Sequence, residues 1–275
     1  MRPYNQQMIM QSQTMNSPLS IFLDVDGTLL EFASHPDRVI VERPLVSLLN
    51  RLQHALGEAL ALVSGRSIAS LDRLFLPFQG TAVGLHGIEF RAEADGEIDR
   101  IPFDPVPETL LAAITAASRP YRDAFIEHKQ FAVTVHHRLD VATEQALRAR
   151  LMAACAEAGP KWMVLPGRQV LEIKPSWVTK AHGVNRLMAN APFAGTLPIA
   201  FGDDKTDLDM FAAVRRHGGI NVSVGPRIAG AGDLQLRSPG ASLAMLADIA
   251  LLLEQGHDSD MIVRTLRGGD ARRVG

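Results

Sequence analysis

The stretch IFLDVDGTLL, residues 21–30, runs from apolar residues directly into two aspartates, a glycine and a threonine. Its unbroken apolar run is typical of a strand buried on both faces of a parallel sheet. In such sheets, ligands bind beyond the carboxyl ends of the strands. Asp24 and Asp26 fall at that end, and their period-2 spacing directs both side chains to one side. Two adjacent carboxylates without a partner repel each other, so the stretch predicts a cation or phosphate chemistry.

The residues around the pair narrow this interpretation. Gly27 permits a tight turn, and Thr28 offers a hydroxyl and a backbone N–H to an anion. On this stretch alone a plainer interpretation stays open, in which the aspartates are a solvated strand end or cap a turn.

Further strand and helix patterns alternate along the chain. Strand-like apolar runs cover residues 19–26, 60–64, 81–86, 197–201 and 219–224. Helical spacing occurs at residues 44–56, 67–75, 180–189 and 207–217. This alternation predicts an α/β fold, a doubly wound parallel sheet.

The middle of the chain breaks that rhythm with the order α-β-β-α-β-β, which predicts a small α+β domain with an antiparallel sheet. We therefore expect a core domain formed by residues 18–101 and 179–268, with a cap domain, residues 102–178, inserted into it. Residues 1–17 are expected to be a disordered tail and residues 269–275 a flexible one.

Two other strand ends carry polar groups that suit the same chemistry. Ser64, Gly65 and Arg66 follow one strand and open a helix, where a hydroxyl and free N–H groups suit a phosphate oxygen. Asp203, Asp204 and Asp207 follow another strand, and carboxylates near an oxygen-rich site favour magnesium. Simple helix capping by Ser64, Asp204 or Asp207 is the competing interpretation in each case.

Composition limits the classes of partner. The 275 residues carry a formal net charge of −2, which provides no general attraction to nucleic acid or an anionic membrane, so small molecules are the expected partners. The single cysteine, Cys155, has helical surroundings and is expected to be a core residue in a reducing compartment. No apolar run approaches a membrane span or a signal peptide, so we expect a cytoplasmic protein.

The motifs DVDGT, SGR, a lysine opening a helix and GDDKTD, in this order on strand ends, resemble those of the haloacid dehalogenase (HAD) superfamily of phosphotransferases. The resemblance implies an HAD-like core, and the inserted unit resembles the cap of sugar phosphatases. Ser64 and Lys180 are 116 residues apart, which leaves room for such a cap.

Finer features resemble the trehalose-6-phosphate phosphatase family. They are GLHGIEF at 84–90, IEHKQFAVTVHHR at 126–138 and GRQVLEIKP at 167–175. The resemblance implies Mg²⁺-dependent hydrolysis of trehalose 6-phosphate through an aspartyl-phosphate, and a possible partnership with a trehalose-6-phosphate synthase. A phosphatase of another sugar phosphate (sucrose, mannosyl or glucosyl type), a phosphomutase and a non-catalytic sugar-phosphate sensor are the competing hypotheses.

The resemblance also implies residue roles. Asp24 would be the nucleophile, Asp26 the acid and base, and Lys180 the cation that meets the phosphate. The implied metal ligands are Asp24, the backbone carbonyl of Asp26 and Asp203, oriented by Asp204 and Asp207. Phosphate binding is expected of Thr28, Ser64, Gly65 and Arg66. Substrate binding is expected of Glu127, Lys129, His136, Arg138, Glu172 and His86.

Overall fold

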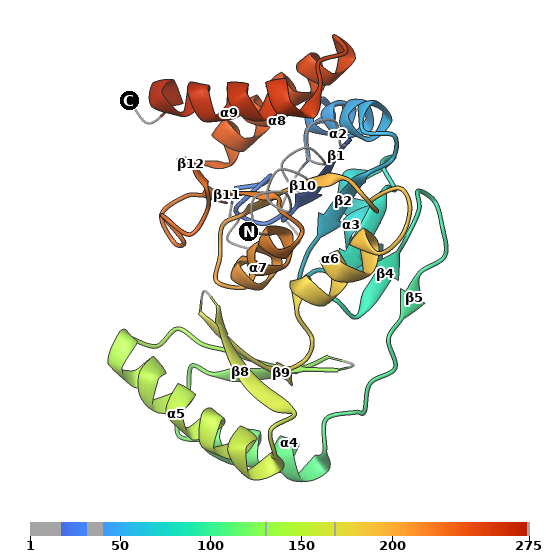
Figure 1. Cartoon of the computed structure of the whole chain (residues 1–275). Coiled ribbons are helices and arrows are strands. Elements are labelled where there is room, and N and C mark those ends of the chain that lie inside the picture. The colour runs from blue at the N-terminus through green and yellow to red at the C-terminus, as the bar shows by residue number, and fades with distance from the viewer. Residues whose placement is uncertain (1–17, 32–40, 130, 168, 274–275) are drawn as a thin grey trace, which may run out of the picture. The chain divides into compact units, whose positions relative to one another are not determined.

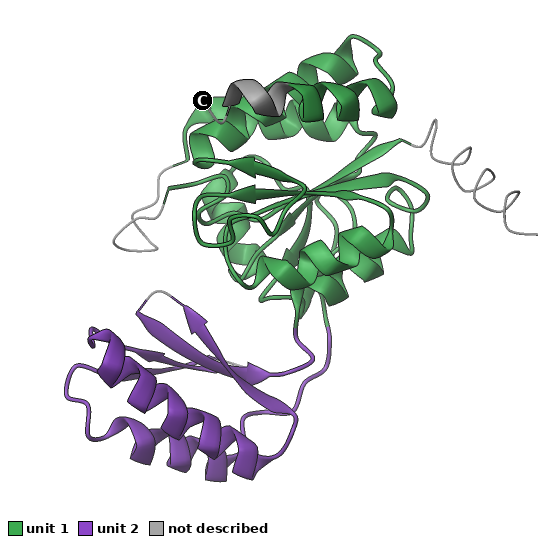
Figure 2. Cartoon of the chain, turned by 60° about the vertical axis from the view of Figure 1, so that its left-hand side comes forward, with its two compact units in different colours: residues 1–100, 179–275 green, residues 101–178 purple. Residues whose placement is uncertain are grey.

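The computed structural model describes residues 18–31, 41–129, 131–167 and 169–273. The chain divides into two compact units, unit 1 of residues 1–100 and 179–275 and unit 2 of residues 101–178 (Figure 2). The expected tail of residues 1–17 lies outside the described residues. The expected flexible segment 269–275 overlaps the last turns of helix α9 (Ser259–Arg273).

Unit 1 contains an eight-stranded sheet in the order β12-β11-β10-β1-β2-β3-β4-β5 (Figure 1). The strands that pair in parallel are β1 (Leu19–Leu23), β2 (Leu60–Val63), β3 (Thr81–Gly84), β10 (Leu197–Gly202), β11 (Ile220–Val224) and β12 (Leu234–Leu236). This confirms the doubly wound α/β prediction. The sequence did not predict β12 at the other edge of the sheet. It also did not predict β4 (Glu89–Arg91) and β5 (Asp99–Arg100), which extend the β3 edge with antiparallel pairing.

Helices cover both faces of this sheet (Figure 2). α2 (Arg43–Ala55) packs against α8 (Pro239–Glu254), and α6 (Lys180–Met188) packs against α7 (Asp207–Arg216). The β1-α2-β2 and β10-α7-β11 crossovers run in opposite directions along the sheet, so right-handed connections place α2 and α7 on opposite faces. α3 (Ile68–Phe75) follows β2 and contacts β3 and β4.

The register of the central strands determines where the functional residues meet. Leu23 of β1 pairs with Phe201 of β10 and with Leu62 of β2, so the three strands end at one edge of the sheet. Asp24, Ser64 and Asp203 each follow one of these strands within two residues. The fold thus gathers at one edge the polar groups that are dispersed in the sequence.

Unit 2 contains a four-stranded antiparallel sheet in the order β6-β7-β9-β8. Its elements are α4 (Glu108–Ser118), β6 (Phe125–His128), β7 (Val133–His136), α5 (Val141–Ala158), β8 (Trp162–Gly167) and β9 (Val170–Pro175). Leu147 and Leu151 of α5 pack with Val133, Val135 and other strand residues in one apolar cluster. Cys155 is buried in the same cluster, as expected, and burial raises the pKa of its thiol to about 11.

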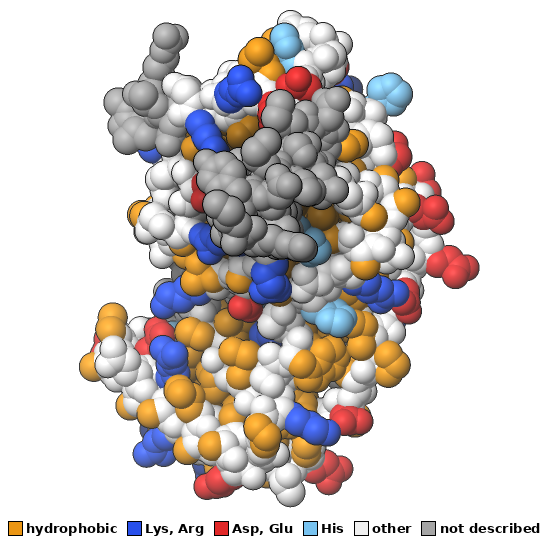
Figure 3. Space-filling model, viewed as in Figure 1, with side chains coloured by type: hydrophobic (Ala, Val, Ile, Leu, Met, Phe, Trp, Pro, Cys, Tyr) orange, Lys and Arg blue, Asp and Glu red, His pale blue; other side chains and the backbone are white. Residues whose placement is uncertain are grey.

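Both basic and acidic side chains lie on the face that Figure 3 shows, with exposed apolar side chains between them. Among the described residues, no helix is both long enough and apolar enough to cross a bilayer.

Candidate active site

Asp24 is the central carboxylate of the site. It follows β1, is 5% exposed, and accepts a hydrogen bond from Lys180 Nζ at 2.5 Å. The second oxygen, Oδ2, is buried and has no hydrogen bond of normal geometry to a described residue, while the nearby Thr28 hydroxyl acts to lower the Asp24 pKa. One oxygen of Asp24 is therefore held by a cation while the other is available to a ligand or reactant.

Lys180 is the first residue of α6 and is 2% exposed. Its Nζ also donates to Asp207 Oδ1 at 2.6 Å, so one ammonium group bridges two carboxylates. Burial by itself would lower the pKa of Lys180, but the charges of Asp207 and Asp24 and both hydrogen bonds outweigh burial and raise it. Lys180 is consequently a permanent positive charge within the site.

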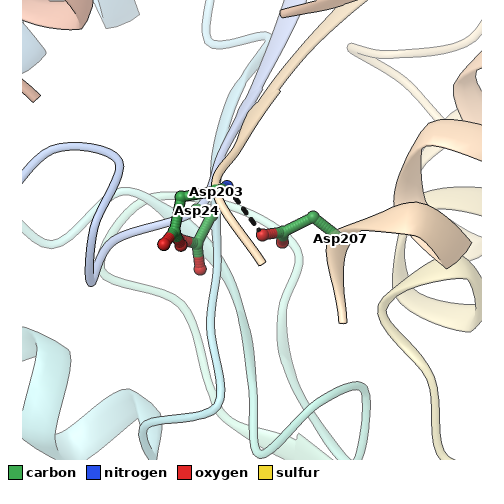
Figure 4. Close-up of side chains that lie close together, drawn as sticks. All are labelled: Asp24, Asp203 and Asp207. Atoms are coloured by element: carbon green, nitrogen blue, oxygen red, sulfur yellow. Dashed lines mark hydrogen bonds between the residues drawn. The ribbon is translucent and has the colours of Figure 1, made fainter. Parts of the chain in front are cut away.

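Asp207, the first residue of α7, is fully buried and fixes the preceding loop. Its Oδ2 accepts hydrogen bonds from the backbone N–H groups of Asp203 and Asp204, each at 3.0 Å (Figure 4 shows the first). Asp204 Oδ1 instead accepts the N–H of Lys205 at 2.7 Å. Neither side chain therefore caps α7 through its helical amides, which was the competing interpretation of these aspartates.

Asp24, Asp203 and Asp207 each offer one oxygen, and these three oxygens lie within 4.8 Å of one another (Figure 4). An all-oxygen donor set suits a hard divalent cation, and the unpartnered Asp24 Oδ2 is the kind of atom that such an ion satisfies. The residues present therefore fit a metal ion. The side chain of Asp207, expected to act only indirectly, belongs to this cluster.

Burial and neighbouring carboxylates raise the pKa of two of these residues. Burial, followed by the charge of Asp207, raises the pKa of Asp24 to about 7 against the opposing effect of Lys180. Burial, followed by the charge of Asp24, raises the pKa of Asp203 to about 8. Concentrated negative charge of this kind is typical of functional sites and of sites that receive a cation.

Asp26 is paired differently from Asp24. Its Oδ2 and Oδ1 accept hydrogen bonds from Arg66 Nε and Nη2, both at 2.7 Å. This bidentate arrangement joins the loop after β1 to the loop after β2. The two aspartates of DVDGT thus have separate partners and separate environments.

The loop after β2 contains the expected phosphate-binding residues. Ser64 is buried, and its Oγ accepts the N–H of Arg66 at 3.1 Å. Ser67, not Ser64, caps α3 by accepting the N–H of Ser70 at 3.2 Å, so the capping interpretation of Ser64 does not apply. Across the edge, Thr28 Oγ1 is buried and makes no hydrogen bond to a described residue.

His86 lies against this loop. Its N–H donates to Ser64 O at 3.0 Å, and a Cβ placed on Gly65 would come within 2.6 Å of the imidazole Cε1 and Nε2. Leu85 and His86 have φ angles of 50° and 57°, which non-glycine residues seldom adopt. Strained backbone held by surrounding structure is common at functional sites. A side chain at position 65 would therefore need the His86 ring to move.

The side chain of Glu89 also holds the loop after β2 in place, a role that the sequence did not predict. It is 2% exposed and accepts the N–H of Ile68 at 2.7 Å with one oxygen and Arg100 Nε at 2.9 Å with the other. Glu89 belongs to β4, and the turn at 84–88 brings its side chain to the first residue of α3. No periodic pattern in the sequence indicates this contact.

The expected substrate residues of unit 2 form two pairs. His136 Nε2 lies 2.7 Å from Glu127 Oε2, and Lys129 Nζ donates to Glu172 Oε1 at 3.0 Å. Glu127, Thr134, His136 and Glu172 alternate with the strand residues of the apolar cluster, so they lie on the sheet face opposite that cluster. The ring of Phe125 also stacks on His136, with centroids 4.4 Å apart.

Arg138 does not share this arrangement. β7 ends at His136, so Arg138 lies two residues beyond the strand and does not share its alternation of faces. The residue is exposed, and the structure shows no contact that ties it to the two pairs.

Arg227 is a residue of the site that was not predicted from the sequence. It lies in the loop after β11, with Nη1 3.6 Å from both Asp203 Oδ2 and Asp204 Oδ2. The strand-end reasoning used for the other loops, applied to residues 225–228, would have indicated it.

Solved structures support the assignment of the fold. The C-terminal domain of a trehalose-6-phosphate phosphatase from C. albicans superposes with a TM-score of 0.75 at 21% identity, covering 90% of this chain and 98% of that one. A haloacid dehalogenase-like hydrolase from Bacteroides thetaiotaomicron gives 0.62 at 18% identity, covering 85% and 99%. These likenesses show that the chain has an HAD-like fold.

Sequence comparison identifies the family to which the chain belongs. A sequence model of the trehalose-phosphatase family matches residues 22–233. The chain is 38% identical over 234 residues to a probable trehalose-phosphate phosphatase of Sinorhizobium fredii, covering 85% of this chain and 88% of the relative. It is 34% identical over 233 residues to trehalose-6-phosphate phosphatase of Escherichia coli, covering 82% and 86%. The chain belongs to the trehalose-phosphatase family and is a phosphoric monoester hydrolase.

Proposed function

We propose that this chain hydrolyses trehalose 6-phosphate to trehalose and inorganic phosphate, the last step of trehalose biosynthesis, with Mg²⁺ as cofactor. The observation that best supports the chemistry is Asp24, a buried carboxylate with one oxygen on Lys180 and the other unpartnered. The substrate is supported by the family and by two relatives above 30% identity that are named trehalose-phosphate phosphatases.

Asp24 is the nucleophile in this proposal. A phosphoryl transfer needs an oxygen positioned in line and positive charge near the transferred group. One oxygen of the Asp24 carboxylate attacks phosphorus, the bond to the sugar oxygen breaks as that oxygen takes up a proton, and an aspartyl-phosphate forms. Lys180, which donates a hydrogen bond to Asp24 Oδ1, keeps a positive charge where the phosphoryl group arrives.

Asp26 is the acid that protonates the leaving sugar oxygen and the base that then takes a proton from the attacking water. Its carboxylate is bound by Arg66 in a bidentate pair. Because an acid needs a proton on that carboxyl, we propose that the pair opens when the substrate phosphate competes for Arg66. Ser64, Gly65 and Thr28 supply the remaining donors for the phosphate.

Asp24, Asp203 and the backbone carbonyl of Asp26 are the proposed Mg²⁺ ligands, with Asp204 and Asp207 orienting them. When bound, Mg²⁺ supplies charge neutralisation for the transferring phosphoryl group. The oxygen cluster of Asp24, Asp203 and Asp207 supports this proposal.

The residues proposed to recognise the sugar are Glu127, Lys129, His136, Arg138, Glu172 and His86. Carboxylates accept hydrogen bonds from sugar hydroxyls, and cations meet the phosphate or a hydroxyl. Since unit 1 carries the reaction and unit 2 the proposed sugar contacts, hydrolysis of another sugar phosphate is the closest competing function.

A panel of sugar phosphates assayed for phosphate release with Mg²⁺ tests the substrate. Activity on other sugar phosphates but not on trehalose 6-phosphate would contradict it. Asp24→Asn should abolish turnover without unfolding, whereas Asp209→Asn, an exposed change on α7, should not affect it. Wild-type-like activity of Asp24→Asn would rule out the nucleophile.

The same protein preparation distinguishes a phosphatase from a phosphomutase and from a sugar-phosphate sensor. In labelled water, a phosphatase places the label in the released phosphate, while a phosphomutase forms a sugar-phosphate isomer instead. A wild type that binds sugar phosphate without turning it over would favour a sensor. A cytoplasmic location and a partnership with a synthase remain predictions.

A further inference from the structure

Arg227 contacts two carboxylates of the proposed metal site at a distance longer than a hydrogen bond. Its Nη1 is 3.6 Å from Asp203 Oδ2 and from Asp204 Oδ2, beyond the distance of a normal N–H···O bond. The guanidinium is thus an electrostatic partner shared by two neighbouring acids. It lies on the loop after β11, separate in sequence from every motif considered above.

The balance of charge among the residues in direct contact indicates the role of Arg227. Asp24, Asp203, Asp204 and Asp207 are opposed by two cations with ion-pair contacts to them, Lys180 and Arg227. When all these groups are ionised, the excess of the acids over these two cations corresponds to one divalent cation. Without Arg227, that excess of negative charge grows by one.

We infer that Arg227 is a positioning residue that compensates part of the acidic cluster and thereby weakens its affinity for Mg²⁺. The inference rests on the metal site of the proposed function. Arg227 pairs with the carboxylate of Asp203, and Mg²⁺ would coordinate the same carboxylate. Binding of the metal therefore weakens the contact between Arg227 and Asp203.

The two cations of the cluster differ in how firmly they are held. Lys180 is 2% exposed and makes two hydrogen bonds of 2.5 and 2.6 Å. The Arg227 side chain is 33% exposed and makes longer contacts to these acids. Longer contacts made by a partly solvated side chain are weaker than two short hydrogen bonds in a buried position. Arg227 is therefore the more weakly held of the two cations that contact these acids.

The size of the effect follows from Coulomb's law. Two like-signed ions sharing a carboxylate lie within a Debye length at about 0.1 M salt, so their repulsion is only partly screened. In a water-like dielectric this repulsion changes a dissociation constant by roughly 3- to 20-fold. Removing the charge at 227 should tighten Mg²⁺ binding by that factor.

The test measures Mg²⁺ binding by calorimetry on the full chain, with no substrate present. Arg227→Gln should lower the Mg²⁺ Kd by roughly 3- to 20-fold. Arg227→Lys keeps the charge and should bind close to wild type. Arg216→Gln is the matched control, because it removes the same charge from an exposed residue at the far end of α7 and should leave the Kd unchanged.

Thermal unfolding in EDTA provides a second measurement. Arg227→Gln should unfold at a lower temperature than wild type without metal, and added Mg²⁺ should raise its Tm by more than it raises that of wild type. A purely structural role for Arg227 would lower the Tm without tightening the Kd.

An Arg227→Gln protein with an unchanged or larger Kd would overturn the inference while leaving the proposed metal site in place. A wild-type protein that binds no Mg²⁺ would overturn both the inference and the metal site. Trehalose 6-phosphate hydrolysis by wild type is scored separately, so failure of the proposed substrate remains distinguishable.

Discussion

Replacing Lys180 with methionine in the metal-free protein should reduce stability by an amount that depends on pH. Lys180 Nζ is the shared partner of Asp24 and Asp207, and methionine fills similar space without the charge. Removing one partner from a buried ion pair typically costs about 3–5 kcal/mol, because the remaining charge stays buried. The cost is reduced wherever Asp24 can take up a proton instead.

The pH range follows from the Asp24 pKa. Burial first, and then Asp207, raises it to about 7, while Lys180 opposes the rise. Without Lys180 the folded-state pKa rises further, since an oppositely charged neighbour commonly lowers a carboxyl pKa by about 1–3 units. Above pH 7 the folded variant then holds a proton that folded wild type has lost, and both unfolded chains have lost it. As the pH rises above 7, the difference in unfolding free energy between wild type and variant should therefore increase by about 1.4 kcal/mol per pH unit. The increase ends where Asp24 ionises in the folded variant.

Urea unfolding in EDTA from about pH 6 to about pH 9 measures this dependence. The matched control is Lys161→Met, since Lys161 is 76% exposed and makes only a 3.7 Å contact with Asp104. That control should cost below about 1 kcal/mol at every pH. A Lys180→Met loss that stays constant across the range would refute the assignment of the Asp24 charge.

Three further changes test the packing and the polar contacts that support the site. Gly183→Ala should cost roughly 1–3 kcal/mol in urea unfolding, because the new Cβ would overlap the Val83 methyl groups where α6 packs on the sheet; unchanged stability would contradict that packing. Leu151→Ala should cost roughly 2–5 kcal/mol by emptying the apolar cluster of unit 2, whereas Met152→Ala, 51% exposed, should cost far less; equal losses would contradict the cluster. Glu89→Gln should cost roughly 1–3 kcal/mol, because the amide leaves either Ile68 N–H or Arg100 without its acceptor; a thermal unfolding midpoint equal to wild type would rule this out.

The sequence predicted the parallel core because its signals are local. An apolar run that ends in Asp24, or in Gly202 and Asp203, predicts a strand and also predicts which edge of the sheet binds ligands. The short strands β4 and β5 have no such run. They form because the turn at 84–88 returns the chain against β3, a tertiary effect that no local pattern records.

The site was predictable as a set of residues but not as a set of contacts. Strand-end reasoning identified Asp24, Asp203 and Asp207, and the family resemblance identified Lys180. The bridging of Asp24 and Asp207 by this lysine, however, depends on how α6 and α7 pack. Alternation along β6 and β7 puts Glu127 and His136 on one face of the unit 2 sheet, whereas Arg138 lies two residues beyond the end of β7, which the sequence does not reveal.

The close approach of His86 to Gly65 joins two positions that belong to different loops. A methyl group at 65 would occupy space now filled by the imidazole ring. Because the ring is the outer end of a side chain, it can rotate away while both backbones stay in place. An alanine at 65 would thus displace the histidine ring from its present position, and substitutions at 65 should be tolerated better with a smaller residue at 86. The two positions should therefore change together during evolution or in a designed library.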